Sequence, residues 1–130
     1  MKLFSILLLL VLAVACVRTQ RAYAPAATGE AARIVGHGVT LREVNGVPIG
    51  SLTAVVEVLS GRNEVAFTVN PANLHVDVAS AARFYLEAEL EPGVTYAVAS
   101  PRGDGRICLF KLGLSGQPDF SDPVSCAVRK

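Results

Sequence analysis

Tryptophan is absent from the 130-residue chain, and aromatic residues make up only 6% of it. Proteins that stack bases or sugars on aromatic side chains depend on such residues, so these ligand classes are disfavoured. An excess of either charge is also lacking, since Lys and Arg number 12 and Asp and Glu number 11. This balance argues against a nucleic-acid partner, because nucleic-acid affinity comes largely from neutralised phosphates.

Histidine is scarce, and the two residues present are His37 and His75. Acyl-transfer catalysis needs a nucleophile beside a base, and only these imidazoles could serve as the base. The Gly-x-Ser-x-Gly motif of a nucleophile elbow is missing. His37 stands between Gly36 and Gly38, where it could be a ligand or could mark a bulge in a strand. We therefore predict no catalytic residues, no enzyme and no cofactor.

The sequence offers too few ligands for a metal site. His75 and Asp77 are two residues apart, so on a strand they would point to the same face and could offer two ligands. A zinc site uses three or four protein ligands, and no third is identifiable. The alternative is a solvated outer face, and we predict no metal.

The first residues have the order of a secretory signal. Lys2 supplies a positive charge, Leu3 to Val14 form an apolar run, and Ala13 and Ala15 are the small residues that a signal peptidase reads. The run is shorter than the roughly 20 residues that span a bilayer. Residues 1–15 are thus predicted to be a signal peptide and not part of the fold.

The end of this run is Leu12-Ala13-Val14-Ala15-Cys16. This segment resembles the lipobox of bacterial lipoproteins, although Ala13 stands where Leu is usual. In that family the Cys thiol receives diacylglycerol, the chain is cut before it, and the new amino group is often acylated. The resemblance implies a lipid anchor at Cys16. Because Val17 is not the Asp of inner-membrane retention, it implies an outer-membrane lipoprotein that faces the periplasm. The alternative is ordinary secretion after cleavage behind Ala15.

The three cysteines fit this interpretation. If Cys16 carries lipid, Cys108 and Cys126 remain as one pair, and an oxidising compartment lets them form a disulfide. Closing a loop of this order stabilises the fold by about 3 kcal/mol. A redox or metal role is disfavoured because the spacing is not Cys-x-x-Cys and no His lies nearby.

Residues 16–32 are small and polar, with Pro25 and Gly29 as breakers, and they are predicted to be the lipidated Cys and a flexible tether. From Arg33 onward apolar residues alternate with period two, as in strands. Turn signals such as Asn45-Gly46 separate the runs. We therefore predict that residues 33–130 form one all-β domain, a small antiparallel β-sandwich of about seven to eight strands. The expected strands are 33–44, 52–59, 63–70, 73–79, 83–91, 94–100, 106–112 and 123–128.

A weak family likeness lies in the turns. It is carried by Val44-Asn45-Gly46-Val47, by Val58-Leu59-Ser60-Gly61-Arg62-Asn63-Glu64-Val65 and by Leu90-Glu91-Pro92-Gly93-Val94-Thr95-Tyr96. These segments resemble PEGA-like modules and small β-rich lipoproteins. Asn45 replaces the usual Asp, Ser60 replaces a Pro, and Asn63 stands near the usual His. The likeness implies a sandwich that scaffolds or binds something at the cell envelope, and it transfers no active site.

Two features are candidates for partner binding. Glu87, Glu89 and Glu91 alternate along one strand face with Tyr85, so they form either a solvated face paired with Arg on a neighbour or an acidic stripe that meets a basic partner. Phe120 lies in a long loop, where it is either a contact residue or an apolar plug over the open end of the sandwich.

These features predict a non-catalytic, membrane-anchored envelope lipoprotein that acts as a structural or protein-binding β module. Its predicted partners are the membrane, through the lipid anchor, and an envelope protein. The alternative is a periplasmic module that binds a small ligand or acts as an inhibitor.

Overall fold

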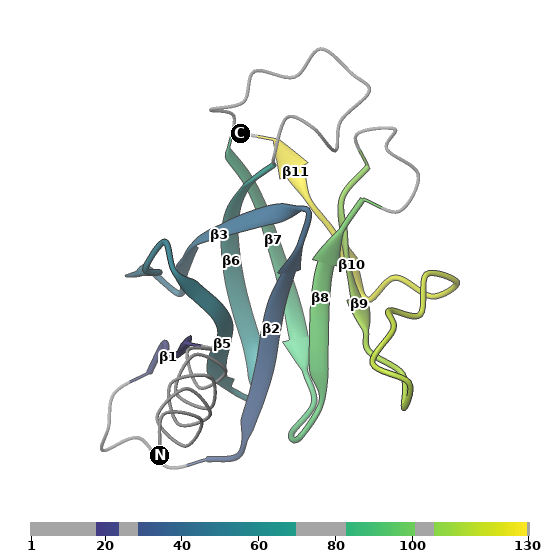
Figure 1. Cartoon of the computed structure of the whole chain (residues 1–130), viewed down its shortest axis with the longest axis horizontal. Helices are drawn as coiled ribbons and strands as arrows, with labels where there is room; N and C mark the ends of the chain where they lie inside the picture. Colours follow the sequence, from purple (N-terminus) through teal and green to yellow (C-terminus); the bar gives the residue numbers. More distant parts are fainter. Residues whose placement is uncertain (1–17, 24–28, 70–82, 101–105, 130) are drawn as a thin grey trace, which may run out of the picture.

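The structure, a computed structural model, describes residues 18–23, 29–69, 83–100 and 106–129. Within these ranges every regular element is a strand, and the strands form two sheets that pack together (Figure 1). The strands are β1 Arg18–Arg21, β2 Ala31–His37, β3 Val39–Val44, β4 Val47–Pro48, β5 Thr53–Leu59, β6 Gly61–Val69, β7 Arg83–Leu90, β8 Thr95–Ala99, β9 Cys108–Lys111, β10 Ser125–Cys126 and β11 Val128–Arg129. The predicted all-β sandwich is confirmed.

Sheet A has the strand order β1-β5-β2-β8-β9-β10, and sheet B has the order β11-β7-β6-β3-β4. Sheet B is antiparallel throughout. Sheet A is mixed, because β1 pairs with β5 and β2 pairs with β8 in parallel. The prediction of an antiparallel sandwich therefore holds for one sheet and for part of the other.

The core lies between the sheets and is built by the alternation seen in the sequence. In β7 the burial pattern alternates strictly, with Phe84 and Leu86 inside and Glu87 and Glu89 outside. Sheet A contributes fully buried side chains to the same core, among them Tyr96, which also accepts a hydrogen bond at its hydroxyl from the Glu91 amide at 2.8 Å. Burial of apolar area supplies the main stabilisation of such a core.

The predicted strand 33–44 is two strands in two different sheets. β2 belongs to sheet A, β3 belongs to sheet B, and the chain turns between them at Gly38, whose φ is 75°. A Cβ on Gly36 would lie 2.6 Å from the Val39 carbonyl oxygen, so the corner needs glycine there. The glycines around His37 thus mark a change of sheet rather than a bulge.

The predicted flexible tether over 16–32 is wrong for residues 18–23 and for Ala31 and Ala32, which begin β2, because all of these residues belong to the sandwich. β1 pairs in parallel with β5, and Ala22 after it is 4% exposed within the core. Tyr23 donates a hydrogen bond from its hydroxyl to Glu57 Oε1 at 2.9 Å. Among the described residues the sandwich therefore includes segments that precede the expected start at Arg33, because pairing with β5 gives them a place in sheet A.

The other strand boundaries differ in detail. The predicted strand 123–128 is divided at Ala127, where β10 of sheet A gives way to β11 of sheet B. The predicted strand 73–79 lies outside the described residues. The Asn45-Gly46 hairpin is confirmed, since both residues have positive φ, 52° and 77°, and Val44 pairs with Val47 across a two-residue turn.

Candidate protein-binding face

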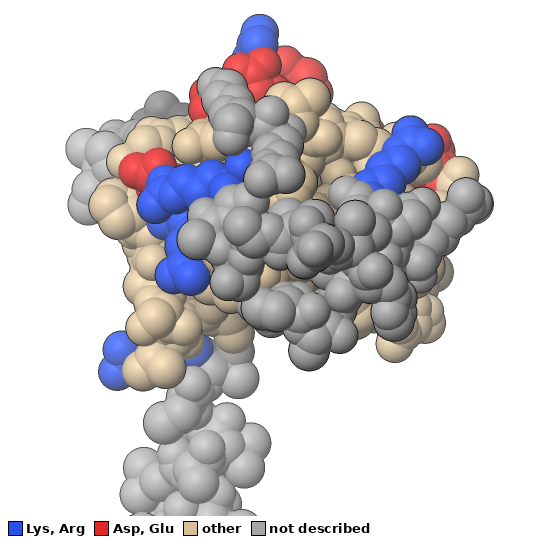
Figure 2. All heavy atoms as spheres, turned by 90° about the horizontal axis from the view of Figure 1, so that it is seen from above, with Lys and Arg blue, Asp and Glu red and all other residues tan. Residues whose placement is uncertain are grey.

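The outer surface of sheet B carries most of the candidate site. Four glutamates lie there, and we call the surface around them the acidic face: Glu43 on β3, Glu64 on β6, and Glu87 and Glu89 on β7. Glu64, Glu87 and Glu89 reach this surface because each alternates with core residues on its strand, whereas Glu43 follows a register shift in β3 after Leu41. In the view of Figure 2 acidic and basic side chains are unevenly spread, and the largest group of acidic ones lies at the upper margin.

Two carboxylates of the acidic face are directly opposed. Glu64 and Glu87 are cross-strand partners in the register of β6 and β7, and both are exposed. Like charges directly opposite each other destabilise a sheet. This arrangement therefore needs a compensating charge.

Arg62 supplies part of that compensation. Its guanidinium forms an ion pair with the Glu87 carboxylate, and Arg62 is also the cross-strand partner of Glu89. The hydrogen bond to Glu87 is the main cause that raises the pKa of Arg62 above its ordinary value, and the charges of Glu87, Glu89 and Glu64 add to it. Arg83, at 3.4 Å from Glu43, is a further basic group on this surface, and so is Arg42, whose Nε donates to the Thr68 hydroxyl at 3.0 Å. Of the two interpretations that the sequence allowed, the solvated face paired with Arg on a neighbouring strand is thus confirmed for Glu87.

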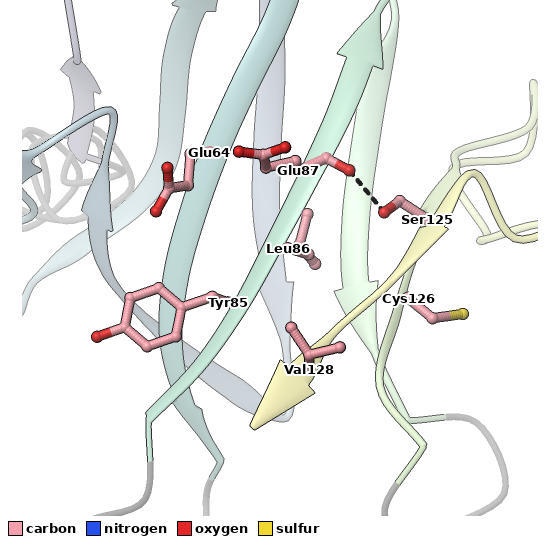
Figure 3. Close-up of a pocket in the computed structure, with 7 residues that line it drawn as sticks. All are labelled: Glu64, Tyr85, Leu86, Glu87, Ser125, Cys126 and Val128. Atoms are coloured by element: carbon pink, nitrogen blue, oxygen red, sulfur yellow. Dashed lines mark hydrogen bonds between the residues drawn. The ribbon is translucent and has the colours of Figure 1, made fainter. Parts of the chain in front are cut away.

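A shallow hollow of about 340 Å³ lies where the acidic face meets the last strands. Its lining residues are Glu64, Tyr85, Leu86, Glu87, Ser125, Cys126 and Val128. Figure 3 shows Glu64 and Glu87 beside each other at one end and Tyr85 and Val128 at the other. Val128 is 63% exposed, so the hollow has an apolar contact point at the end opposite the paired carboxylates.

The chemistry available at this surface is binding by charge and apolar contact. The exposed carboxylates attract basic side chains, and Val128 and Tyr85 offer area that a partner could bury. His37 lies at the end of β2 in the other sheet, so it brings no imidazole to the acidic face. The Cys126 sulfur at the rim of the hollow is bonded to Cys108 and is no free thiol.

Phe120 lies away from the acidic face. Its ring packs edge-to-face on Phe110 of β9, with centroids 5.2 Å apart. Phe110 belongs to a small second cluster with Ala99 and Cys108, separate from the core between the sheets. Phe120 therefore covers the outer face of sheet A, which corrects the expectation of a plug over the open end. It keeps 46% exposure, so the contact role stays a prediction.

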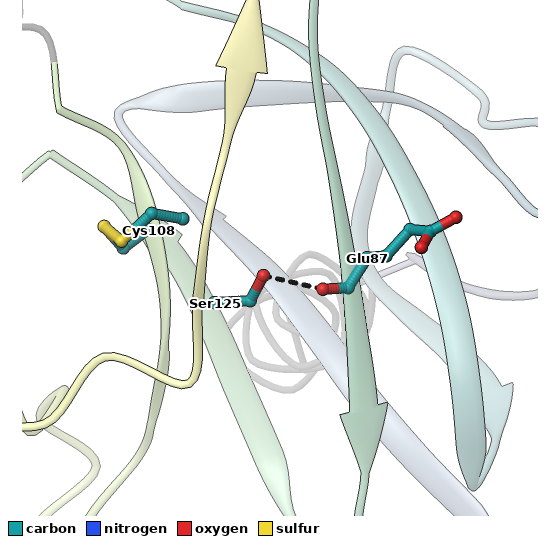
Figure 4. Close-up of a disulfide and its surroundings, with 4 residues drawn as sticks. Glu87, Cys108 and Ser125 are labelled. Atoms are coloured by element: carbon teal, nitrogen blue, oxygen red, sulfur yellow. Dashed lines mark hydrogen bonds between the residues drawn. A yellow bond between two sulfur atoms is a disulfide. The ribbon is translucent and has the colours of Figure 1, made fainter.

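The predicted disulfide between Cys108 and Cys126 is present. The two residues are cross-strand partners on β9 and β10 and stand 18 positions apart in the sequence. Ser125, next to Cys126, donates a hydrogen bond from its hydroxyl to the Glu87 carbonyl at 2.6 Å (Figure 4). The disulfide thus fixes a segment that also contacts the strand of the acidic face.

The remaining candidates are placed as follows. Cys16, His75 and Asp77 lie outside the described residues. Across the parts of the chain that the structure describes, no group of three His, Cys, Asp or Glu could hold a metal ion. Those same parts also contain no helix that is long and apolar enough to cross a bilayer.

Sequence reasoning missed the partners of the candidate glutamates. Glu64 had the right alternation to be placed on an outer face, but its opposition to Glu87 depends on the register of β6 and β7. Val128 joins the site because β11 crosses to sheet B, and its sequence carries no signal for that crossing. Glu91 also departs from the acidic stripe, since it pairs with Lys111 of sheet A at 3.0 Å.

Comparison with known proteins adds no relative. No protein-family model matches the chain, and neither a curated protein nor a solved structure is significantly similar to it.

Proposed function

We propose that the chain is a non-catalytic lipoprotein of the bacterial outer membrane, anchored through Cys16 on the periplasmic side, whose acidic face binds a basic segment of an envelope protein. The observation that carries the binding role is the direct opposition of Glu64 and Glu87 on an exposed surface. Such a pair weakens the sheet by itself, and a cationic partner would relieve it. The lipobox-like signal supports the location, as does the disulfide, which is typical of an oxidising compartment.

The basic partner is favoured over a neutral one by charge. Arg62 compensates Glu87 and Arg83 compensates Glu43, but Glu64 has no ion pair among the described residues. A Lys or Arg side chain placed between Glu64 and Glu87 would meet two carboxylates at once. Val128 and Tyr85 would then form the apolar part of the contact.

Photo-crosslinking in the native envelope tests the proposed binding. We replace Val128 with p-benzoylphenylalanine, which places the probe at the rim of the hollow, and replace Leu114 with it as a control on an exposed loop away from this face. We expect one crosslinked product from the Val128 position, containing a basic protein. The combined Glu64→Gln and Glu87→Gln substitutions should abolish it, whereas Glu30→Gln should leave it unchanged. A product that survives loss of both carboxylates contradicts the proposal.

The anchor is tested separately by mass spectrometry of the protein from membranes. We expect a mature chain that begins at Cys16 and carries diacylglycerol, with Cys108 and Cys126 oxidised. An unprocessed N-terminus, or a mature chain without lipid, would contradict the proposed location.

The hollow supports one alternative function. Its volume of about 340 Å³ is at the small end of the range of ligand pockets, so a small cationic molecule could fit. A rise in melting temperature with spermidine that is lost in Glu64→Gln, together with no crosslinked protein, would favour a ligand-binding module.

A further inference from the structure

The edge of the sandwich formed by β1 and β4 is joined directly to the predicted anchor. Cys16 precedes Arg18, the first residue of β1, by two positions. Two residues span at most about 7 Å even when fully extended. A lipid on Cys16 would therefore hold the start of β1 at the membrane surface, with no long tether between them.

The segment next to this point is the turn between β4 and β5. Arg18 pairs with Thr53, and because β1 and β5 are parallel, the chain enters β1 on the side where β5 also begins. Leu52 immediately precedes Thr53 and is 71% exposed. The anchor and an exposed leucine thus lie at the same end of the same strand pair.

The stretch of chain around Leu52 contains no charged residue. Residues 44–56 contain no Asp, Glu, Lys or Arg, although the segment includes the exposed positions Pro48, Gly50 and Ser51. An exposed turn without charge can enter the lipid headgroup region without burying a charged group. Of the charges on β1, Arg18 is exposed and has the sign that anionic phosphates attract, whereas Arg21, at the other end of the strand, forms an ion pair with Glu57 at 3.8 Å.

Gln20 holds this edge in one shape. Its Nε2 donates to the Pro48 carbonyl at 2.8 Å, and its Oε1 accepts from the Gly50 amide at 2.9 Å and the Thr53 hydroxyl at 3.2 Å. One side chain therefore fastens β1 to both ends of the turn that carries Leu52. Figure 1 shows β1 on the opposite side of the sandwich from β10 and β11.

We propose that the β1/β4 edge rests on the bilayer, with Leu52 inserted among the lipid headgroups and Arg18 against lipid phosphates. This inference depends on the proposed anchor at Cys16. It gives the domain a fixed orientation, in which the hollow beside β10 and β11 faces away from the membrane and toward the periplasm.

Tryptophan fluorescence tests the orientation cleanly, because the chain contains no Trp. The lipidated full-length Leu52→Trp protein is placed in vesicles of phosphatidylethanolamine and phosphatidylglycerol whose acyl chains are brominated near the headgroup. Leu114→Trp, at a position fully exposed in the other half of the molecule, is the matched control. We expect blue-shifted emission and about twofold quenching for Leu52→Trp, since a side chain at the headgroup boundary meets the bromines, and neither effect for Leu114→Trp.

A second pair of variants tests Arg18. Adding Arg18→Gln to Leu52→Trp should reduce the quenching, whereas adding Arg83→Gln, on sheet B, should not. Equal fluorescence of Leu52→Trp and Leu114→Trp in vesicles to which the protein is bound overturns the orientation and leaves the anchor intact. Failure of the protein to float with vesicles overturns the anchor itself, and the orientation falls with it.

Discussion

The two lateral edges of the sandwich are closed by different chemistry. At the β1/β4 edge the turn from β4 to β5 passes from sheet B to sheet A, and the side-chain hydrogen bonds of Gln20 fasten that turn to β1. At the β10/β11 edge one continuous segment passes from sheet A to sheet B, and the disulfide from Cys126 to Cys108 fixes it covalently. The covalent edge lies beside the acidic face, and the hydrogen-bonded edge lies beside the predicted anchor. The difference indicates that the acidic face is preorganised by a covalent link nearby, whereas the β1/β4 edge depends on polar side-chain contacts.

Removing the disulfide is expected to lower the free energy of unfolding more than any other change considered. The Cys108→Ala/Cys126→Ala variant should lose about 3 kcal/mol of unfolding free energy, because its unfolded chain is no longer restricted by a closed loop. Urea denaturation of the oxidised wild type and the variant measures this loss. A reducing agent should destabilise the wild type and leave the variant unchanged. Equal stability of the two proteins would show that the edge does not depend on the disulfide.

A smaller effect is expected at the opposite edge. Gln20→Ala removes three partly exposed hydrogen bonds and should lower the unfolding free energy by about 1 kcal/mol. Amide hydrogen exchange should accelerate in β1 while β9 and β10 keep their protection. Gln117→Ala, on an exposed loop, is the matched control and should change neither. Uniform acceleration in both edges would mean that they do not open independently.

Removing one of the two opposed carboxylates should raise the free energy of unfolding slightly. Glu64→Gln removes the like-charge contact with Glu87 and should stabilise the free protein by about 0.5 kcal/mol at low salt. Glu87→Gln should give no such gain, because it also removes the ion pair with Arg62. Thermal unfolding at low and high ionic strength measures both, and salt should shrink the difference. A destabilised Glu64→Gln protein would mean that Glu64 has a structural role.

The smallest effect concerns Tyr23, beside the hydrogen-bonded edge. Its hydrogen bond to Glu57 is the main cause that raises its pKa above the ordinary value, followed by burial and the Glu57 charge, while Arg21 opposes the shift. A raised pKa means that the stabilisation is complete below the ordinary tyrosine value of about 10 and is lost as the pH rises through the folded value. Phenolate absorbance and unfolding at alkaline pH measure it. Tyr23→Phe and Glu57→Gln should both reduce this alkaline loss, and an unchanged profile in either would contradict the assignment.

The sequence predicted the elements whose residues alternate. β5, β6, β7 and β8 were expected within two residues of their observed bounds, because a strand with one buried face must repeat with period two. The disulfide is predictable because the chain has three cysteines, and assigning Cys16 to lipid leaves Cys108 and Cys126 as a pair. The same alternation predicts that Glu87 and Glu89 lie on an outer face, because they alternate with apolar residues along the strand.

What could not be predicted depends on contacts between distant segments. Arg18–Arg21 has no apolar alternation, and it is a strand only because β5 offers an unpaired edge. The Gly36-His37-Gly38 corner shows in the sequence as two glycines, which fit a bulge as well as a change of sheet. The Glu64–Glu87 pair requires the register of two strands joined by a long connection. In each case the local pattern allows several outcomes, and tertiary packing selects one.

The passage of residues 125–129 from one sheet to the other also sets an order of events. β10 completes sheet A and β11 completes sheet B, and both lie at the very end of the described chain. Neither sheet is whole, and the second sulfur of the disulfide is missing, until residues 125–129 have been synthesised. A nascent chain that reaches only residue 124 therefore lacks one strand of each sheet and the disulfide, and such an open state is the one a protein needs if it is to thread through a narrow secretion channel before it folds.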